Sequence, residues 1–127
     1  MDEIRSLPQS LDAERAVLGG LMLDCERMSE VHEIVESEDF YRETHQKLYQ
    51  LMVDMNSRGE PVEMVSVVEA ISRDGGEGGY GGVAYVSSLS DQVPSTQNLA
   101  YYAGIVRERA VARRLIEKSR EITEKVM

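Results

Sequence analysis

The residues best suited to chemistry in this sequence lie in the glycine-rich stretch RDGGEGGYGGVAYV, residues 73–86. From Gly76 to Gly81 the stretch reads G-x-G-x-x-G, the pattern with which dinucleotide-binding domains bring backbone N–H groups to a pyrophosphate. That fingerprint requires a strand before the glycines and a βαβ unit around them. The residues on both sides have helical spacing instead, so we expect a loop between two helices and no cofactor at this position.

Metal binding and nucleophilic catalysis have few candidate residues. His32 and His45 fall on different predicted helices, and neither has Cys, His or Glu partners at metal-ligand spacing. Cys25 lies between Asp24 and Glu26, whose negative charges disfavour a reactive thiolate. The other carboxylates have the distribution of ordinary helix surface. We therefore expect no catalytic residue, no cofactor site and no metal site in this chain.

The composition predicts one small intracellular domain. A length of 127 residues suits a single domain, and with 42% hydrophobic but only 6% aromatic residues, aliphatic side chains must fill most of its core. A single cysteine excludes an internal disulfide and indicates a reducing, cytoplasmic setting. No apolar run approaches the roughly 18 residues of a membrane span, and the N-terminus lacks the pattern of a secretory signal.

Charge is distributed unevenly along the chain. The net charge is −9, yet residues 107–127 carry seven Lys and Arg against four Glu. The acidic remainder argues against broad binding to nucleic-acid phosphates, while the basic end leaves one alternative open, a small DNA-binding helical module that works through the C-terminal helix. Opposite charges at i,i+4 spacing favour a solvated, salt-bridged helix over that alternative. These pairs are Arg113–Glu117, Arg120–Glu124 and Glu121–Lys125.

Apolar residues recur at helical spacing along almost the whole chain, which predicts an all-α fold. We expect a compact helical head of about five or six helices over residues 1–94, followed by one long C-terminal helix over residues 95–127. The expected helices begin at Ser10, which is a favourable N-cap, and then cover 28–35, 41–58, 63–73, 83–91 and 96 to the end. Two glycines inside the first helix, Gly19 and Gly20, predict a close approach of another backbone.

The last helix is longer than a small domain needs. About 30 residues would extend roughly 45 Å, and apolar residues form a broad stripe along it. The stripe comprises Ile105, Val111, Ala112, Leu115, Ile116, Ile122 and Val126. Nothing later in this sequence could cover the far half of the stripe. We therefore expect either a fragment of a longer helical structure or self-association through this face.

Several segments together resemble one family, the bacterial replicative DNA helicases of the DnaB family, in their N-terminal domain. The similar stretches are LPQSLDAERAVLGGLMLD at 7–24, EDFYRETHQKLYQLM at 38–52, RGEPVEMVSVVEAI at 58–71, and GGVAYVSSLSDQVPSTQNLAYYAGIVRERAVARRLI at 81–116. They follow the order of the family and cover about four-fifths of the chain. The segments AE-x-x-VLGG, DFY-x-x-x-H and P-S-x-x-N are jointly specific, although none suffices alone.

The resemblance implies a helical head plus the first arm of a long helical hairpin. It also implies that the parent protein is a hexameric, ATP-dependent DNA helicase of chromosome replication and primosome formation. Its ATPase domain, which binds ATP and Mg²⁺, lies outside this chain. Such domains pair into dimers and build a collar that engages the C-terminal domain of primase, and a helicase loader or initiator is a further candidate partner. DNA contact by this domain itself would be weak or absent.

The same resemblance implies roles for particular residues. Primase contact would fall on the fifth helix and the hairpin, where the matching positions are Tyr85, Ile116 and Ile122. Tyr85 could equally be a half-buried surface aromatic, and the two isoleucines plain core of the hairpin. Apart from the resemblance, the stripe adds further candidates for a partner or self-association, namely Ile105, Val111, Leu115 and Val126. One departure concerns the loop GGEGGYGG, which is richer in glycine than the family pattern. Its geometry is therefore not implied by the resemblance.

Overall fold

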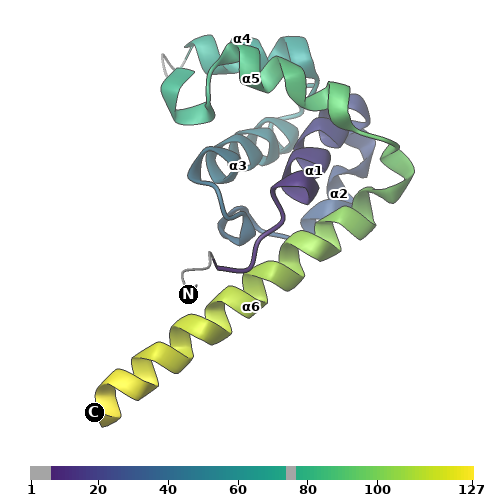
Figure 1. Cartoon of the computed structure of the whole chain (residues 1–127). Helices are drawn as coiled ribbons and strands as arrows, with labels where there is room; N and C mark the ends of the chain where they lie inside the picture. Colours follow the sequence, from purple (N-terminus) through teal and green to yellow (C-terminus); the bar gives the residue numbers. More distant parts are fainter. Residues whose placement is uncertain (1–6, 74–76) are drawn as a thin grey trace.

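The segments whose apolar residues have helical spacing form helices in the structure. The computed structural model describes residues 7–73 and 77–127, and within them every regular element is helical. The α-helices are α1 (Leu11–Leu23), α2 (Met28–His32), α3 (Glu43–Ser57), α4 (Met64–Arg73), α5 (Val83–Ser88) and α6 (Leu99–Val126). Short 3-10 segments connect them, η1 (Cys25–Arg27), η2 (Ser37–Asp39), η3 (Glu77–Tyr80), η4 (Leu89–Gln92) and η5 (Thr96–Asn98). The predicted all-α fold, a head followed by one long helix, is confirmed (Figure 1).

Helix α1 lies at the centre of the head, between α3 and α6 (Figure 1). It begins where the sequence predicts, because the Ser10 hydroxyl accepts a hydrogen bond from the N–H of Ala13 at 3.3 Å. Its inner face is fully buried and joins the aliphatic face of α3 and the start of α6 in one core. The largest members of that core are Leu18, Leu21, Phe40, Leu48, Tyr49, Met52, Met55, Ile71, Leu89 and Leu99.

The paired glycines of α1 allow two later segments to pack against its backbone. A Cβ atom built on Gly19 would overlap the carbonyl oxygen of Leu89 in η4, and one built on Gly20 would overlap the side chain of Leu99 in α6. Both contacts join segments that are about 70 or more residues apart in the chain. The predicted close approach of a second backbone is confirmed at Gly19.

Replacing Gly19 with alanine is expected to lower the free energy of unfolding by about 2 kcal/mol. The added methyl group meets a backbone carbonyl that cannot rotate away, and such overpacking costs about 1–3 kcal/mol, more than the gain of about 1 kcal/mol in helix propensity. Gly104 in α6 is the matched control, because a Cβ there meets nothing within 4 Å. Urea unfolding should show Gly104→Ala unchanged or stabilised; equal effects at both glycines would contradict this account.

The ends of several helices differ from the sequence-based expectation. Helix α2 ends at His32 instead of residue 35, and the chain then turns so that Val35 and Phe40 both enter the core. Helix α5 ends at Ser88 and continues as η4. The end of α3 follows the prediction, since Gly59 adopts a φ of 77° and the N–H of Glu60 reaches the carbonyl of Met55 at 2.9 Å. The ends of α2 and α5 are set by the burial of particular side chains, which local helix propensity does not encode.

The long helix α6 belongs to the head along its first half only. Leu99, Ala103, Val106 and Ala110 pack into the core, whereas every residue from 117 onward is exposed. Figure 1 shows the second half projecting beyond the other helices. The division of the chain near residue 95 stays a prediction, because the first turns of α6 share the core of the head.

Candidate functional site

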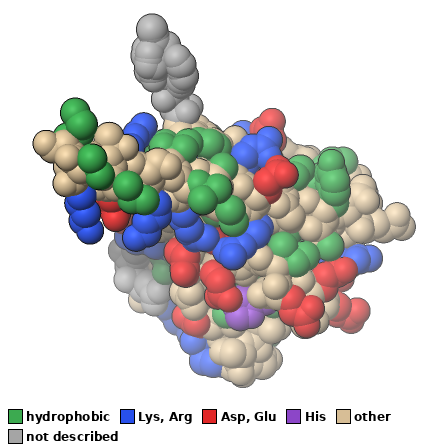
Figure 2. All heavy atoms as spheres, turned by 90° about the horizontal axis from the view of Figure 1, so that it is seen from below, with side chains coloured by type: hydrophobic (Ala, Val, Ile, Leu, Met, Phe, Trp, Pro, Cys, Tyr) green, Lys and Arg blue, Asp and Glu red, His purple; other side chains and the backbone are tan. Residues whose placement is uncertain are grey.

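The apolar stripe of α6 faces away from the head from Val111 onward, whereas Ile105 at its start packs against the core of the head. Leu115, Ile122 and Val126 are 63%, 62% and 80% exposed, and Val111 is exposed beside them. At 100° per residue this face lies opposite Leu99 and Ala103, so it takes no part in the core. Figure 2 shows hydrophobic side chains along this helix, with a row of Lys and Arg next to them.

Spacing along this outward face follows the seam of a coiled coil. Ala112, Leu115, Ser119, Ile122 and Val126 succeed one another at alternating intervals of three and four residues. Beside the seam lies a shallow groove of about 430 Å³, whose walls come from Leu115, Ile116, Ser119, Arg120, Thr123 and Glu124. The outward face therefore has the pattern of a surface that receives another helix.

The structure groups most of the predicted contact residues but separates two of them. Val111, Leu115, Ile122 and Val126 lie together on the outward face, with Ile116 half-buried at its margin. Ile105 in the first half of α6 and Tyr85 on α5 are half-buried and pack against the core of the head. The predicted residues thus form one surface on the arm and two positions on the head.

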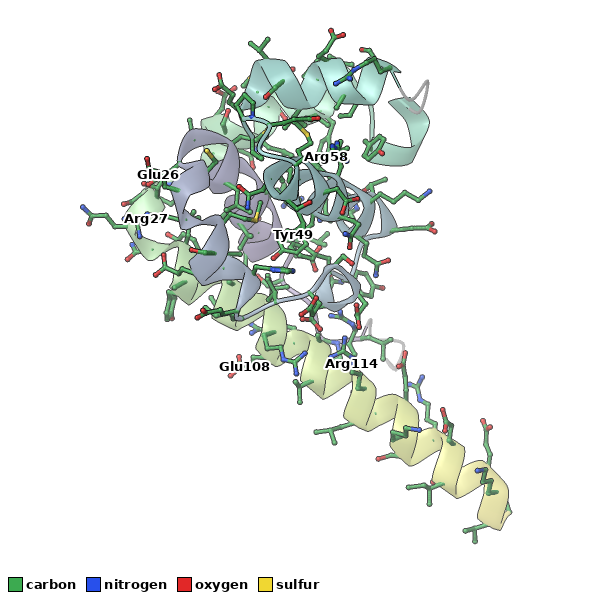
Figure 3. All side chains as sticks on the ribbon, turned by 180° about the vertical axis from the view of Figure 1, so that it is seen from behind. Glu26, Arg27, Tyr49, Arg58, Glu108 and Arg114 are labelled. Carbon is green, nitrogen blue, oxygen red and sulfur yellow. The ribbon has the colours of Figure 1, made fainter. Side chains whose placement is uncertain are left out.

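The basic residues in the first half of α6 attach the helix to the head. The carboxylate of Asp39, fully buried at the end of η2, accepts hydrogen bonds from Arg107 at 3.0 Å and from Arg114 at 2.6 Å. Figure 3 shows Arg114 on the part of α6 that lies beside the head. Arg113 donates to the carbonyl oxygens of Pro8 at 2.9 Å and Asp39 at 2.8 Å, and its guanidinium lies 5.3 Å from the centre of the Tyr41 ring. Three arginines thus position α6 on the turn at residues 39–41 and on the segment before α1.

These contacts correct the expectation of a solvated, salt-bridged helix. Arg113 is only 8% exposed and binds backbone carbonyls instead of Glu117, because the approach of η2 removes it from water. In the part of the chain that the structure describes, Arg120 does not pair with Glu124, nor Glu121 with Lys125; Glu121 instead accepts from Lys118 at 3.5 Å. The prediction of those three i,i+4 pairs is wrong.

A second buried polar cluster links three helices of the head. The Nδ1 atom of His45 on α3 lies 2.7 Å from Oε1 of Glu14 on α1, and its Nε2 atom lies 2.7 Å from the hydroxyl of Tyr85 on α5. The other oxygen of Glu14 accepts the N–H of Tyr41 at 2.7 Å. We call Glu14, His45 and Tyr85 the buried relay. The expectation that the carboxylates are ordinary surface is wrong for Glu14 and Asp39, because both are buried with polar partners.

The buried relay has the order carboxylate, imidazole, hydroxyl, which is also the order of a nucleophile triad. Both Glu14 and His45 are fully buried, so the imidazole lacks the access to substrate that acid–base catalysis needs. The Tyr85 ring instead stacks on His45, with ring centres 6.0 Å apart and an interplanar angle of 11°. Its hydroxyl also interacts with Arg15, whose pKa is raised chiefly by the hydrogen bond with Asp12 and further by Tyr85, against a smaller lowering by burial. The arrangement is suited to holding helices together.

The glycine-rich stretch joins two helices, as the sequence predicts. Helix α4 ends at its first residue, η3 lies within it, α5 begins at Val83, and Gly76 lies outside the described residues. Gly81 and Gly82 adopt φ values of 92° and 94°, which only glycine takes up readily, and they start α5. Without flanking strands the βαβ context of a dinucleotide site is missing here; that the loop binds no cofactor stays a prediction.

The described residues also bear on metal sites and membrane spans. Residues 7–73 and 77–127 contain no group of three or more His, Cys, Asp and Glu side chains that could hold a metal ion. None of the helices in this part of the chain is both long and apolar enough to cross a membrane.

The fold and its surfaces define the class of protein. It is a small all-α domain with a helical arm whose apolar face is open to a partner. The family follows from comparison with known proteins. The chain belongs to the family described as the DnaB-like helicase N-terminal domain, whose profile matches residues 6–108. Since that match covers most of the head and the first turns of α6, it agrees with the resemblance in the sequence.

Relatives and solved structures agree with this membership. The chain is 44% identical over 117 residues to the replicative DNA helicase DnaB of Geobacillus stearothermophilus and 41% identical over 120 residues to that of Mycobacterium leprae. These matches cover 92% and 94% of this chain but only 26% and 20% of the relatives. A crystal structure of the N-terminal domain of DnaB helicase from Mycobacterium tuberculosis superposes with a TM-score of 0.89 at 39% identity, covering 94% of this chain and 86% of that one.

A second solved structure is a DnaB-like replicative helicase described together with its interactions with primase. It superposes with a TM-score of 0.79 at 26% identity and covers 92% of this chain but 28% of that chain. This chain therefore corresponds to about a quarter of the longer helicases that it resembles.

Proposed function

We propose that this chain is the N-terminal assembly and primase-interaction domain of a hexameric, ATP-dependent replicative DNA helicase that acts in the bacterial cytoplasm. The observation that supports it most directly is the outward apolar face of α6, together with the likeness to a helicase described with primase. ATP and Mg²⁺ would be bound by the ATPase domain of the longer protein. A helicase loader or initiator is a further candidate partner of the same domain.

Self-association is the first part of this proposal. The exposed seam from Ala112 to Val126 extends over four turns, and an uncovered apolar face of this kind is a normal route by which helices pair. Lys118 and Lys125 flank the seam, so a partner helix with carboxylates on the matching side would fit best. Covering Leu115, Ile122 and Val126 would remove their large exposed fractions from water.

Primase contact is the second part. Ile116 and Ile122 lie on the arm and Tyr85 on the head, so a primase domain that touched all three would have to bridge α5 and α6 or meet them from different protomers. The hydroxyl of Tyr85 is bound to His45 and one face of its ring stacks on the imidazole, so only the exposed remainder of the half-buried ring is available to a partner. An aromatic ring beside aliphatic positions is typical of interface centres.

Changing both Leu115 and Ile122 to aspartate is expected to abolish self-association while leaving the helical fold intact. Two charges on the seam would have to be desolvated on pairing, which costs several kcal/mol. Light scattering across a concentration series measures the oligomeric state. Val65→Asp, which makes the same apolar-to-aspartate change at a 78% exposed residue of α4 in the head, is the matched control and should still associate. A wild-type chain that stays monomeric at all concentrations would contradict this part of the proposal.

Binding of the cognate primase C-terminal domain, measured by calorimetry, tests the other part. Ile116→Asp together with Ile122→Asp should weaken it at least tenfold, since interface centres lose about 1–3 kcal/mol or more per buried anchor. Unchanged binding would show that the arm does not contact primase. Binding of single-stranded DNA at about 50 mM salt that weakens on Lys118→Ala would favour the DNA-binding module instead.

A further inference from the structure

The buried relay of Glu14, His45 and Tyr85 joins three helices, and two of its members, Glu14 and His45, belong to no proposed partner surface. Both hydrogen bonds of the imidazole are 2.7 Å long, and His45 and Glu14 are fully buried. A buried imidazole with two short hydrogen bonds is held in one orientation. The positions of the protons then decide which side chain donates and which accepts in each hydrogen bond of the relay.

Glu14 determines which nitrogen of His45 carries the proton. An ionised carboxylate only accepts hydrogen bonds, and Oε2 of Glu14 already accepts the N–H of Tyr41. Oε1 accepts the N–H of Arg42 only at 3.5 Å, and its short contact is with Nδ1 of His45 at 2.7 Å. Because the carboxylate oxygen has no proton to give, Nδ1 must carry the proton of that short hydrogen bond. In a neutral imidazole Nε2 is then an acceptor, so the hydroxyl of Tyr85 must donate to it.

Helix α5 is the element that depends on this relay. It has only six residues, begins at two glycines of positive φ and has no side-chain N-cap, so it cannot be stable through its own backbone. Val86 and Leu89 bury it against the core, but apolar burial is non-directional. The hydrogen bond and ring stacking between Tyr85 and His45 supply the direction.

We propose that the Glu14–His45–Tyr85 relay is a positioning device, in which Glu14 fixes the Nδ1–H tautomer of His45 and His45 in turn orients α5 against α3 and α1. Glu14 and His45 act through Tyr85 and touch no partner themselves. The positioning of α5 by the relay does not depend on the proposed function. Its effect on primase binding rests on that function, since α5 is the part of the head that we propose to meet primase.

The first test is the tautomer of His45, read from the ¹⁵N chemical shifts of its ring. The wild-type chain should show a protonated Nδ1 and an unprotonated Nε2. Glu14→Gln should reverse this state: the amide oxygen must face the N–H of Tyr41, so the amide NH₂ faces Nδ1 and the ring proton moves to Nε2. A protonated Nε2 in the wild type, or no reversal in Glu14→Gln, would overturn the proposal.

The second test is hydrogen exchange of the α5 amides. Tyr85→Phe leaves Nε2 of His45 buried without a donor, so exchange protection in α5 should fall about tenfold, the equivalent of 1.4 kcal/mol. Tyr101→Phe is the matched control, because Tyr101 is 70% exposed and its ring contacts only Tyr102 among the aromatic groups. Equal protection in the two variants would show that the hydrogen bond does not hold α5.

The third test concerns the partner and uses a residue that a partner cannot reach. His45→Asn keeps a donor toward Glu14 but loses the acceptor for Tyr85, and it should weaken binding of the primase C-terminal domain at least fivefold. Full-strength binding by His45→Asn would overturn the positioning role. If the wild-type chain does not bind the primase domain at all, the proposed function fails, while the tautomer and exchange results still decide the relay.

Discussion

Replacing Asp39 with alanine is expected to lower the free energy of unfolding by about 2–3 kcal/mol and to loosen the first half of α6 from the head. The carboxylate is fully buried and accepts hydrogen bonds from Arg107, Arg114 and the N–H of Glu36, the last at 2.8 Å. Removing one side of a buried ion pair costs about 3–5 kcal/mol. The expected loss is smaller here because both guanidinium groups are nearly half exposed, 47% and 42%, and can regain water.

Urea unfolding gives the size of this effect, and hydrogen exchange gives its location. Protection should fall along residues 103–114 of α6 and much less in α3, which the carboxylate of Asp39 does not contact through a hydrogen bond. Asp91→Ala is the matched control, because Asp91 is an exposed aspartate of another 3-10 segment, η4, and forms no ion pair in the described chain. A loss below about 0.5 kcal/mol for Asp39→Ala, the range of ordinary surface changes, would refute the attachment of α6 through this carboxylate.

Alkaline conditions should destabilise the domain through one residue, Tyr49. Burial first, and then the negative charges of Glu36 and Asp39, raise the pKa of Tyr49 far above the usual value of about 10. The unfolded chain releases this proton near pH 10, whereas the folded chain keeps it. Stability from Tyr49 is therefore complete below about pH 10 and falls above it, by about 1.4 kcal/mol per pH unit. Between about pH 10 and pH 12 the expected loss is about 2–3 kcal/mol.

Tyr49→Phe isolates this contribution from the other groups that titrate at high pH. The variant loses the hydrogen bond to the carbonyl of Val35, 3.0 Å long, so it should be about 1 kcal/mol less stable at pH 7. The difference between wild type and variant should then shrink and change sign as the pH rises. Tyr101→Phe, at an exposed tyrosine, should keep the wild-type slope. Parallel stability curves for wild type and Tyr49→Phe from pH 9 to 12 would rule out the linkage.

Much of the fold could be predicted because its signals are local. Ser10 has the side chain that an N-cap needs, Gly59 supplies the positive φ that ends α3, and apolar residues three and four positions apart mark the buried face of each helix. Even the close contact at Gly19 had a local sign, since a glycine inside a helix is costly unless it makes room for something. Helix ends that depend on distant burial, such as that of α2, were placed less well.

The polar interior could not be predicted in the same way, although one signal was available. His45 falls on the same helical face as Leu48, Tyr49 and Met52, so a polar residue stood on an apolar face of the predicted helix. Such a residue needs a buried partner. Nothing local identifies that partner: Glu14 precedes His45 by 31 residues and resembles any other acidic residue in the first turn of a helix.

The sequence by itself determined the all-α architecture, the positions of most helices, the apolar stripe from Ile105 to Val126 and the family resemblance, because helical periodicity and motif order are properties of neighbouring residues. Only the tertiary structure decided which charges are solvated and which are structural. Arg107 and Arg114 meet Asp39 across 68 and 75 residues, and Tyr85 meets His45 across 40. Partners so distant are chosen by the packing of α1, α3 and α6, and burial there makes each polar group depend on the other.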